Sequence, residues 1–367
     1  MIALRVLLFL AGMSLVLVAV RSVIRTFIVP RALRNYLTRV VFVAVRKIFA
    51  LRASERHDYP TRDRVMAYYA PVALLMMLVV WVGILLIGFT AMFYALGGLS
   101  VLQAFTFAGS AMFTLGFASR GDAATVLLDF VAAGTGLVFL ALFITYLPSL
   151  YASFQRRERG VAKLEVRAGQ PPTGIYLIEL AWVVGRLENL NDLWAEWEDW
   201  FTDVDESHSS LPALVFFRST HPEQSWVTAA GAILDGASLF DSTVDVPRVP
   251  EPQYMIRSGY LCLRHLADYF RIAVDHDPRP DDPISIGREE FDAAYERLAG
   301  NGVPLRADRD QCWRDFAGWR VNYDAALIGL ARLTTAPDAP WSAARRVVAP
   351  AFQDPRPDPG TDRPAGR

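Results

Sequence analysis

The chain has 367 residues, of which 53% are hydrophobic and 20% charged; its net charge is -1 and its mean hydropathy is +0.24. The 55 residues from Val65 to Ser119 carry no charge, and a membrane-spanning helix needs only about 20 apolar residues. The composition therefore excludes a secreted soluble protein and indicates a membrane protein. Two cysteines, Cys262 and Cys312, cannot form a disulfide framework, as expected if that half lies in the cytosol.

Charge is distributed unevenly along the chain. Between Arg21 and Arg64 eleven Lys and Arg residues face three acids, a net charge of +8, whereas residues 155–367 hold 24 basic and 33 acidic residues, a net charge of -9. Loops rich in Lys and Arg stay on the cytoplasmic side of a membrane. We therefore expect a multi-pass protein of the cell inner (plasma) membrane, with the N-terminus outside, the C-terminal half cytoplasmic and no nucleic-acid partner.

The first apolar run predicts a transmembrane anchor over residues 1–23. The positive charges of Arg21 and Arg25 follow this run instead of preceding it, which favours an anchor over a cleaved signal peptide. Residues 24–65 then form a basic linker. Within it, 33–51 mixes apolar and basic residues, typical either of a helix in the interface that contacts anionic lipids or of a short helix packed on the C-terminal half.

A pore domain is predicted over residues 66–151. An outer helix over 66–96 and an inner helix over 123–151 enclose Gly97–Asp122, which is mostly apolar but too short for two further spans. In this segment Gly97, Gly98 and Ser100 predict a break and an N-cap, 101–113 predicts a short helix, and 114–118 is compact and irregular. Non-helical backbone at membrane depth is tolerated only where protein or a water-filled path satisfies it, so the segment predicts a re-entrant pore loop.

This order resembles the pore module of the potassium-channel superfamily, in which an outer helix, a pore helix, a T-x-G-[YF]-G strand and an inner helix follow one another. Here the strand is Thr114-Leu115-Gly116-Phe117-Ala118. The resemblance implies that the carbonyls of residues 114–117 replace the water shell of a potassium ion, with the Thr114 hydroxyl closing the inner site. One such loop per chain implies a homotetramer. The expected protein is a tetrameric cation channel with no cofactor beyond permeant potassium.

Two departures from the family pattern concern ion selectivity. The second glycine is replaced by Ala118, which would cost about 1 kcal/mol if the backbone there took a positive φ. The acid expected at the outer mouth comes only at Asp122, after Arg120. The ion is therefore expected to be potassium, with weakly selective cation flow as the alternative. Ser110 is expected to bond its own helix, the alternative being a bond that supports the filter, and Asp129 is expected behind the filter.

The inner helix contains Gly134 and Gly136 near its middle. A glycine at that depth can act as a gating hinge in the family that the chain resembles, or it can allow close helix packing. Pro148 is expected to bend the helix or free a carbonyl. The arginines do not repeat every third residue within a span, so no voltage sensor is expected.

Residues 155–345 predict an all-α cytosolic domain, so the whole chain is expected to be an all-α membrane protein. Helical spacing puts Trp194, Trp197 and Trp200 on one face, which is typical of a core. We find no catalytic motif and no metal-ligand spacing, and expect neither an enzyme nor a metal site. The domain is expected to gate the channel in response to an unknown regulatory ligand; residues 346–367 are expected to be disordered. The alternative function is a non-conducting membrane-anchored adaptor that displays the helical domain.

Overall fold

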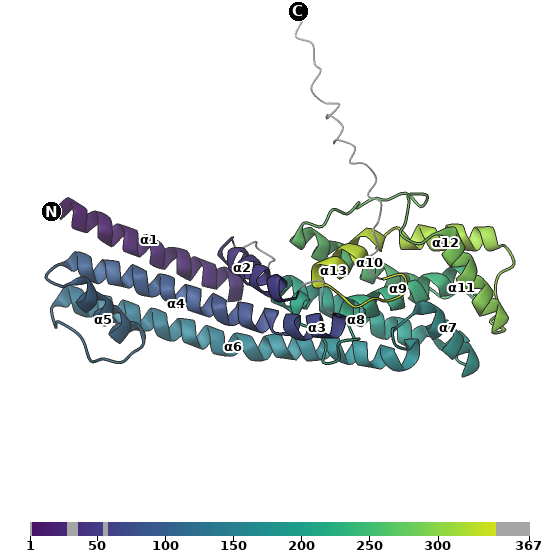
Figure 1. The fold of residues 1–367 in the computed structure, drawn as a ribbon, viewed down its shortest axis with the longest axis horizontal. Helices are drawn as coiled ribbons and strands as arrows, with labels where there is room; N and C mark the ends of the chain where they lie inside the picture. Colours follow the sequence, from purple (N-terminus) through teal and green to yellow (C-terminus); the bar gives the residue numbers. More distant parts are fainter. Residues whose placement is uncertain (1, 28–35, 54–57, 343–367) are drawn as a thin grey trace, which may run out of the picture.

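A computed structural model describes residues 2–27, 36–53 and 58–342, and within these ranges every regular element is a helix and no strand occurs. Figure 1 shows an elongated molecule, with long helices side by side at one end and a bundle of shorter helices at the other. We call residues 2–27 and 69–151 the membrane part and residues 174–342 the helical domain. The helices are α1 Ile2–Phe27, α2 Tyr36–Arg52, α3 Tyr59–Ala67, α4 Tyr69–Leu96, α5 Val101–Met112, α6 Ala123–Ala168, α7 Gly174–Val183, α8 Asn191–Ser210, α9 Trp226–Thr243, α10 Glu251–Phe270, α11 Arg288–Gly300, α12 Arg309–Arg320 and α13 Asp324–Thr334, with short 3-10 turns η1 Leu187–Asn189 and η2 Pro212–Phe216.

Three helical segments are long and apolar enough to cross a membrane: α1, the α3–α4 pair over Tyr59–Leu96, and α6. This confirms the all-helical class and the three predicted apolar helices, which mark a membrane protein. α1 and α4 cross so closely that a Cβ atom on Gly12 would overlap the Gly88 carbonyl oxygen. Small residues at that crossing therefore set the distance between the two helices.

Helix α6 is longer than the sequence predicts. The inner helix was expected to end at residue 151 and a separate domain to begin at 155, but α6 continues without a break to Ala168 and includes Pro148. Beyond residue 155 the apolar residues keep helical spacing, so that Val161, Leu164 and Ala168 are buried in the core of the helical domain. Helix α6, roughly 70 Å long, thus extends from the membrane part into the core of the helical domain.

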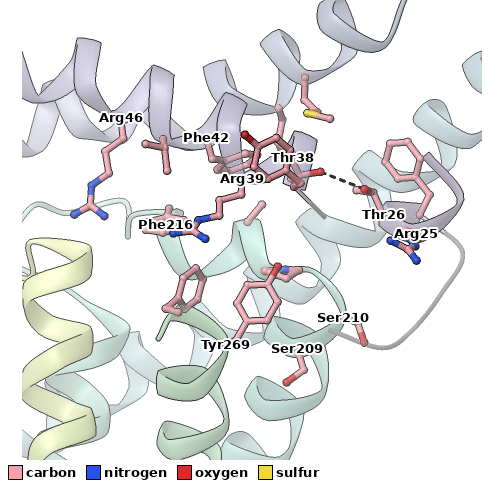
Figure 2. Close-up of a pocket in the computed structure, with 18 of the residues that line it drawn as sticks. Arg25, Thr26, Thr38, Arg39, Phe42, Arg46, Ser209, Ser210, Phe216 and Tyr269 are labelled. Carbon is pink, nitrogen blue, oxygen red and sulfur yellow. Dashed lines mark hydrogen bonds between the residues drawn. The ribbon is translucent and has the colours of Figure 1, made fainter. Parts of the chain in front are cut away.

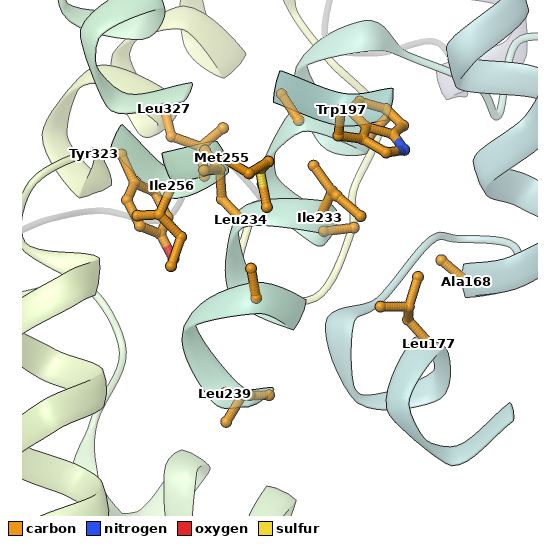
Figure 3. Close-up of a cluster of buried hydrophobic side chains, with 14 of the residues drawn as sticks. Ala168, Leu177, Trp197, Ile233, Leu234, Leu239, Met255, Ile256, Tyr323 and Leu327 are labelled. Atoms are coloured by element: carbon orange, nitrogen blue, oxygen red, sulfur yellow. The ribbon is translucent and has the colours of Figure 1, made fainter. Parts of the chain in front are cut away.

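The core of the helical domain lies around α9, which is buried along nearly its whole length (Figure 3). Trp194, Trp197 and Trp200 are buried in this core, as their spacing predicts. Cys262 and Cys312 are also buried, and both are unpaired. The predicted disordered tail lies outside the described residues.

A buried charge network joins three segments of the helical domain. Arg320 on α12 is fully buried; its Nε donates to Asp324 Oδ1 at 2.7 Å, its Nη1 donates to Asp235 Oδ1, and its Nη2 donates to the Trp341 carbonyl at 2.7 Å. Tyr323 Oη donates to the same Asp235 oxygen at 2.9 Å. Because both acids contact the guanidinium, the network pairs its charges inside the core.

The basic linker forms α2, which packs on α4 through Val41 and Val45. Arg46 Nη2 donates to the Leu333 carbonyl of the helical domain at 2.8 Å. One face of α2 is therefore packed on the helical domain, as one of the two interpretations requires, while Val43 and Ile48 remain exposed on another face.

Candidate functional site: the segment between α4 and α6

Helix α5 begins where the sequence predicts. Ser100 and Gln103 form a capping box, in which the Gln103 N–H donates to Ser100 Oγ at 3.3 Å and the Ser100 N–H donates to Gln103 Oε1 at 2.8 Å. Gly97 and Gly98 precede it with φ of +89° and +72°, values that favour glycine. This turn reverses the chain after α4, so that α5 folds back between the ends of α4 and α6 (Figure 1).

The inner face of α5 is made of small residues. Ala104, Ala108 and Ser110 are buried. On α6, Gly136 packs directly against the end of α5, where a methyl group would overlap the Met112 carbonyl oxygen. The C-terminal end of α5 is therefore fixed by close packing against the first third of α6.

Ser110 organises the residues that follow α5. Its carbonyl oxygen accepts from the Leu115 N–H at 2.8 Å and from the Gly116 N–H at 3.4 Å. Its Oγ accepts from the Ala118 N–H at 3.1 Å. The expected bond of Ser110 to its own helix is replaced by the alternative, a bond to the irregular segment.

These bonds set the direction of the backbone carbonyls. In a trans peptide the C=O points opposite to the N–H of the next residue. Because the N–H groups of Leu115, Gly116 and Ala118 are directed at Ser110, the carbonyls of Thr114, Leu115 and Phe117 point away from α5. Among the described residues, none donates a hydrogen bond to these three carbonyls.

Backbone conformation makes this arrangement possible. Thr114 and Gly116 take φ of +54° and +70°, on either side of Leu115. Left-handed residues alternating with ordinary ones direct successive N–H groups to one side, so the intervening carbonyls lie on the other. The strain expected at Ala118 is absent, because its φ is not positive. The left-handed conformation falls instead on Thr114, where a β-branched residue adopts it against its preference.

Three polar contacts hold the turn between residues 118 and 123. Ser119 Oγ donates to Asp129 Oδ2 at 2.9 Å, which places Asp129 beside the end of the irregular segment. Thr125 Oγ1 donates to Asp122 Oδ2 at 3.0 Å. Arg120 Nη1 donates to the Gly97 carbonyl at 2.6 Å, so this arginine binds the end of α4 instead of standing free at the mouth.

Gly134 and Gly136 of α6 differ in their surroundings. Gly136 packs on Met112, whereas a Cβ atom on Gly134 would meet no atom of the chain within 4 Å. The helix continues through both positions without a break. This packing favours the close-contact interpretation for Gly136 and leaves the hinge as a prediction for Gly134.

Sequence reasoning offered a bond from Ser110 to the irregular segment only as the alternative, without naming Ala118, and it did not find the Arg120–Gly97 bond. Both join residues that only the folded turn brings together. The short spacing from Ser110 to Ala118 is a signal that could have suggested the first. In the helical domain, the described residues include no group of three His, Cys, Asp or Glu side chains that could hold a metal ion.

Comparisons of the chain with protein-family models, with curated proteins and with solved structures found no match.

Proposed function

We propose that four copies of this chain form a cation channel, in which residues 114–118 of each copy meet at a shared axis and their carbonyls bind permeant potassium. The observation that carries the proposal is the carbonyl arrangement at Thr114, Leu115 and Phe117, which have no donor in the described chain and point away from α5. Backbone carbonyls at membrane depth need a partner, and a dehydrated cation on the axis supplies one.

The surface of the single chain supports assembly in the membrane. Leu115 and Phe117 are 61% and 68% exposed, and a further apolar set on α6 is also exposed. Such surfaces suit lipid or neighbouring copies of the chain and do not suit water. The exposed apolar residues of α6 include Leu127, Phe130, Val131, Leu137, Val138 and Ile144.

The continuity of α6 supports gating by the helical domain. Arg157 on α6 is fully buried and donates to the carbonyls of Leu214 and Phe217 at 2.8 and 2.7 Å. Trp200 Nε1 donates to the Arg157 carbonyl at 3.0 Å. A displacement of the helical domain would therefore move α6, and with it the surface against which α5 packs.

Flux through the purified protein tests the proposal. The full chain is reconstituted into liposomes, and potassium and sodium uptake are measured with and without barium. We expect potassium uptake that exceeds sodium uptake and that barium blocks. A complete absence of flux from folded tetramers, across pH and calcium concentration, would favour the non-conducting adaptor. Equal uptake of both ions would leave a cation channel that does not select potassium.

A further inference from the structure

A cavity of about 430 Å³ lies at the junction of the membrane part and the helical domain. Residues of α1, α2, α4 and α6 line it on one side, and residues of α8, η2, α10 and α13 on the other. Figure 2 shows Arg25 and Arg39 across from Ser209, Ser210 and Tyr269 of the helical domain. We call it the junction cavity; its volume lies in the range of about 300–1,000 Å³ that is typical of ligand sites.

The charges of the junction cavity have one sign. Arg25, Arg39, Arg46 and Arg271 line it, and no aspartate or glutamate of the described residues does. Arg46 already has partners within the chain: its Nη2 donates to the Leu333 carbonyl, and its guanidinium lies over the Phe216 ring, 5.9 Å from the centroid. The side chains of the other three arginines have no hydrogen bond or ion pair with any described residue. The cavity thus concentrates positive charge without a counterion among the described residues, so an anion would be stabilised there.

Another part of the lining of the junction cavity is aromatic and comes from the spanning helices. Trp81 of α4 and Phe143 of α6 line it. Phe27 packs edge-on against Trp81 with ring centroids 5.3 Å apart, and against Tyr146 at 4.6 Å. A small soluble anion would leave the space beside these aromatic side chains empty, whereas an acyl chain would fill it.

We propose that the junction cavity binds one anionic phospholipid from the leaflet that faces the helical domain. Its phosphate contacts Arg25, Arg39 and Arg271, and the start of an acyl chain lies toward Trp81 and Phe143. Guanidinium groups suit phosphate because they donate several hydrogen bonds in a fixed plane. The bound lipid would contact α1, α2, α4 and α6 as well as the helical domain, and so stabilise the junction between them.

The test measures lipid binding and does not depend on conduction. The full chain is stripped of lipid in detergent, and native mass spectrometry then measures the binding of phosphatidylglycerol and phosphatidylcholine. We expect phosphatidylglycerol to bind preferentially. In the double variant Arg39→Gln/Arg271→Gln its affinity should fall on the order of 30-fold, because each arginine near a lipid headgroup contributes a factor of about five to six to the affinity. Both arginines are exposed, so unchanged circular dichroism should accompany the loss.

A matched control distinguishes lipid binding in this cavity from general attraction of the lipid to the positive charge of α2. The variant Lys47→Gln/Arg52→Gln removes the same charge from exposed residues that do not line the cavity. Its phosphatidylglycerol affinity should match that of the unaltered chain; an equal fall in both variants would overturn the proposal. So would equal binding of the two lipids. Competition by sn-glycerol 1-phosphate as strong as that by the intact lipid would indicate a soluble-anion site and would also overturn it.

Discussion

The membrane part and the helical domain differ in whether their polar groups have partners within the chain and in whether their large apolar side chains are buried. In the helical domain the fully buried Arg320 is paired with Asp235 and Asp324, and the tryptophans of α8 lie in the core. In the membrane part the carbonyls of residues 114, 115 and 117 have no donor among the described residues, and the side chains of Leu115 and Phe117 are exposed. In the membrane part these carbonyls and apolar side chains are therefore available to partners outside the chain.

This difference indicates where the function is located. The helical domain forms the ion pairs of Arg320 within the chain, whereas backbone groups without a donor in an apolar setting require an ion or a neighbouring chain. The junction cavity lies between the two parts, and the side chains of Arg25, Arg39 and Arg271 in it have no partner among the described residues.

The largest effect is expected at Gly116. Its φ of +70° is a conformation that L side chains rarely adopt, and valine there should abolish potassium flux while the tetramer stays assembled. Liposome flux and native mass spectrometry measure the two properties. Gly83→Val is the control, since a Cβ atom there also meets no atom within 4 Å but the residue lies in α4 without a positive φ. Intact flux in Gly116→Val would contradict the filter assignment.

The next largest effect is expected at Arg320, whose buried ion pairs lie in the core of the helical domain. Arg320→Met leaves Asp235 and Asp324 buried without their cation, which should lower the free energy of unfolding by about 3–5 kcal/mol. Tryptophan fluorescence can follow unfolding, because eight of the nine tryptophans follow residue 155. Arg314→Met is the control, since Arg314 is exposed and its side chain bonds only to Gln311. Equal stability of the two variants would show that the network contributes little.

A smaller effect is expected at Ser110, where alanine removes the acceptor of the Ala118 N–H. The loss of one hydrogen bond should cost about 1 kcal/mol and loosen the filter, so we expect reduced selectivity for potassium over sodium with flux retained. Reversal potentials measure this. Thr106→Ala removes a hydroxyl from the same helix that bonds only its own backbone, at the Leu102 carbonyl, and should leave selectivity unchanged. Equal selectivity in both variants would contradict a filter role for Ser110.

A further effect concerns pH. Burial lowers the pKa of His208 well below its usual value of 6.5, with the nearby Arg157 charge as a second cause. Below pH 6.5 the unfolded chain therefore binds a proton that the folded chain does not, and stability should fall by up to about 1.4 kcal/mol per pH unit as the pH drops. Thermal unfolding at several pH values measures the slope. His208→Gln should reduce it and the exposed His221→Gln should not; identical slopes in all three proteins would contradict the assignment.

Local signals made much of the fold predictable. Long apolar runs indicated the three spanning helices, and Gly97, Gly98 and Ser100 indicated the start of α5. Residues 114–118 were also expected to be irregular, and no regular element occurs there.

The remaining features depend on contacts between distant residues. Arg320 meets Asp235 across 85 positions of sequence, and no periodicity reports such a pair. The end of α6 was predicted too early because charged residues such as Arg156 leave the bilayer, although leaving the bilayer does not end a helix. The junction cavity was not predicted either, since it takes Arg39 from α2 and Arg271 from beyond α10.

The most direct test of the central claim is a distance measurement between copies of the chain. Cys262 and Cys312 are buried, so a spin label on Ala124→Cys, an exposed residue of the first turn of α6, reacts selectively. Pulsed electron paramagnetic resonance in liposomes should give two distances, related as the side and the diagonal of a square. A single distance, or none, would contradict four filter segments around one axis.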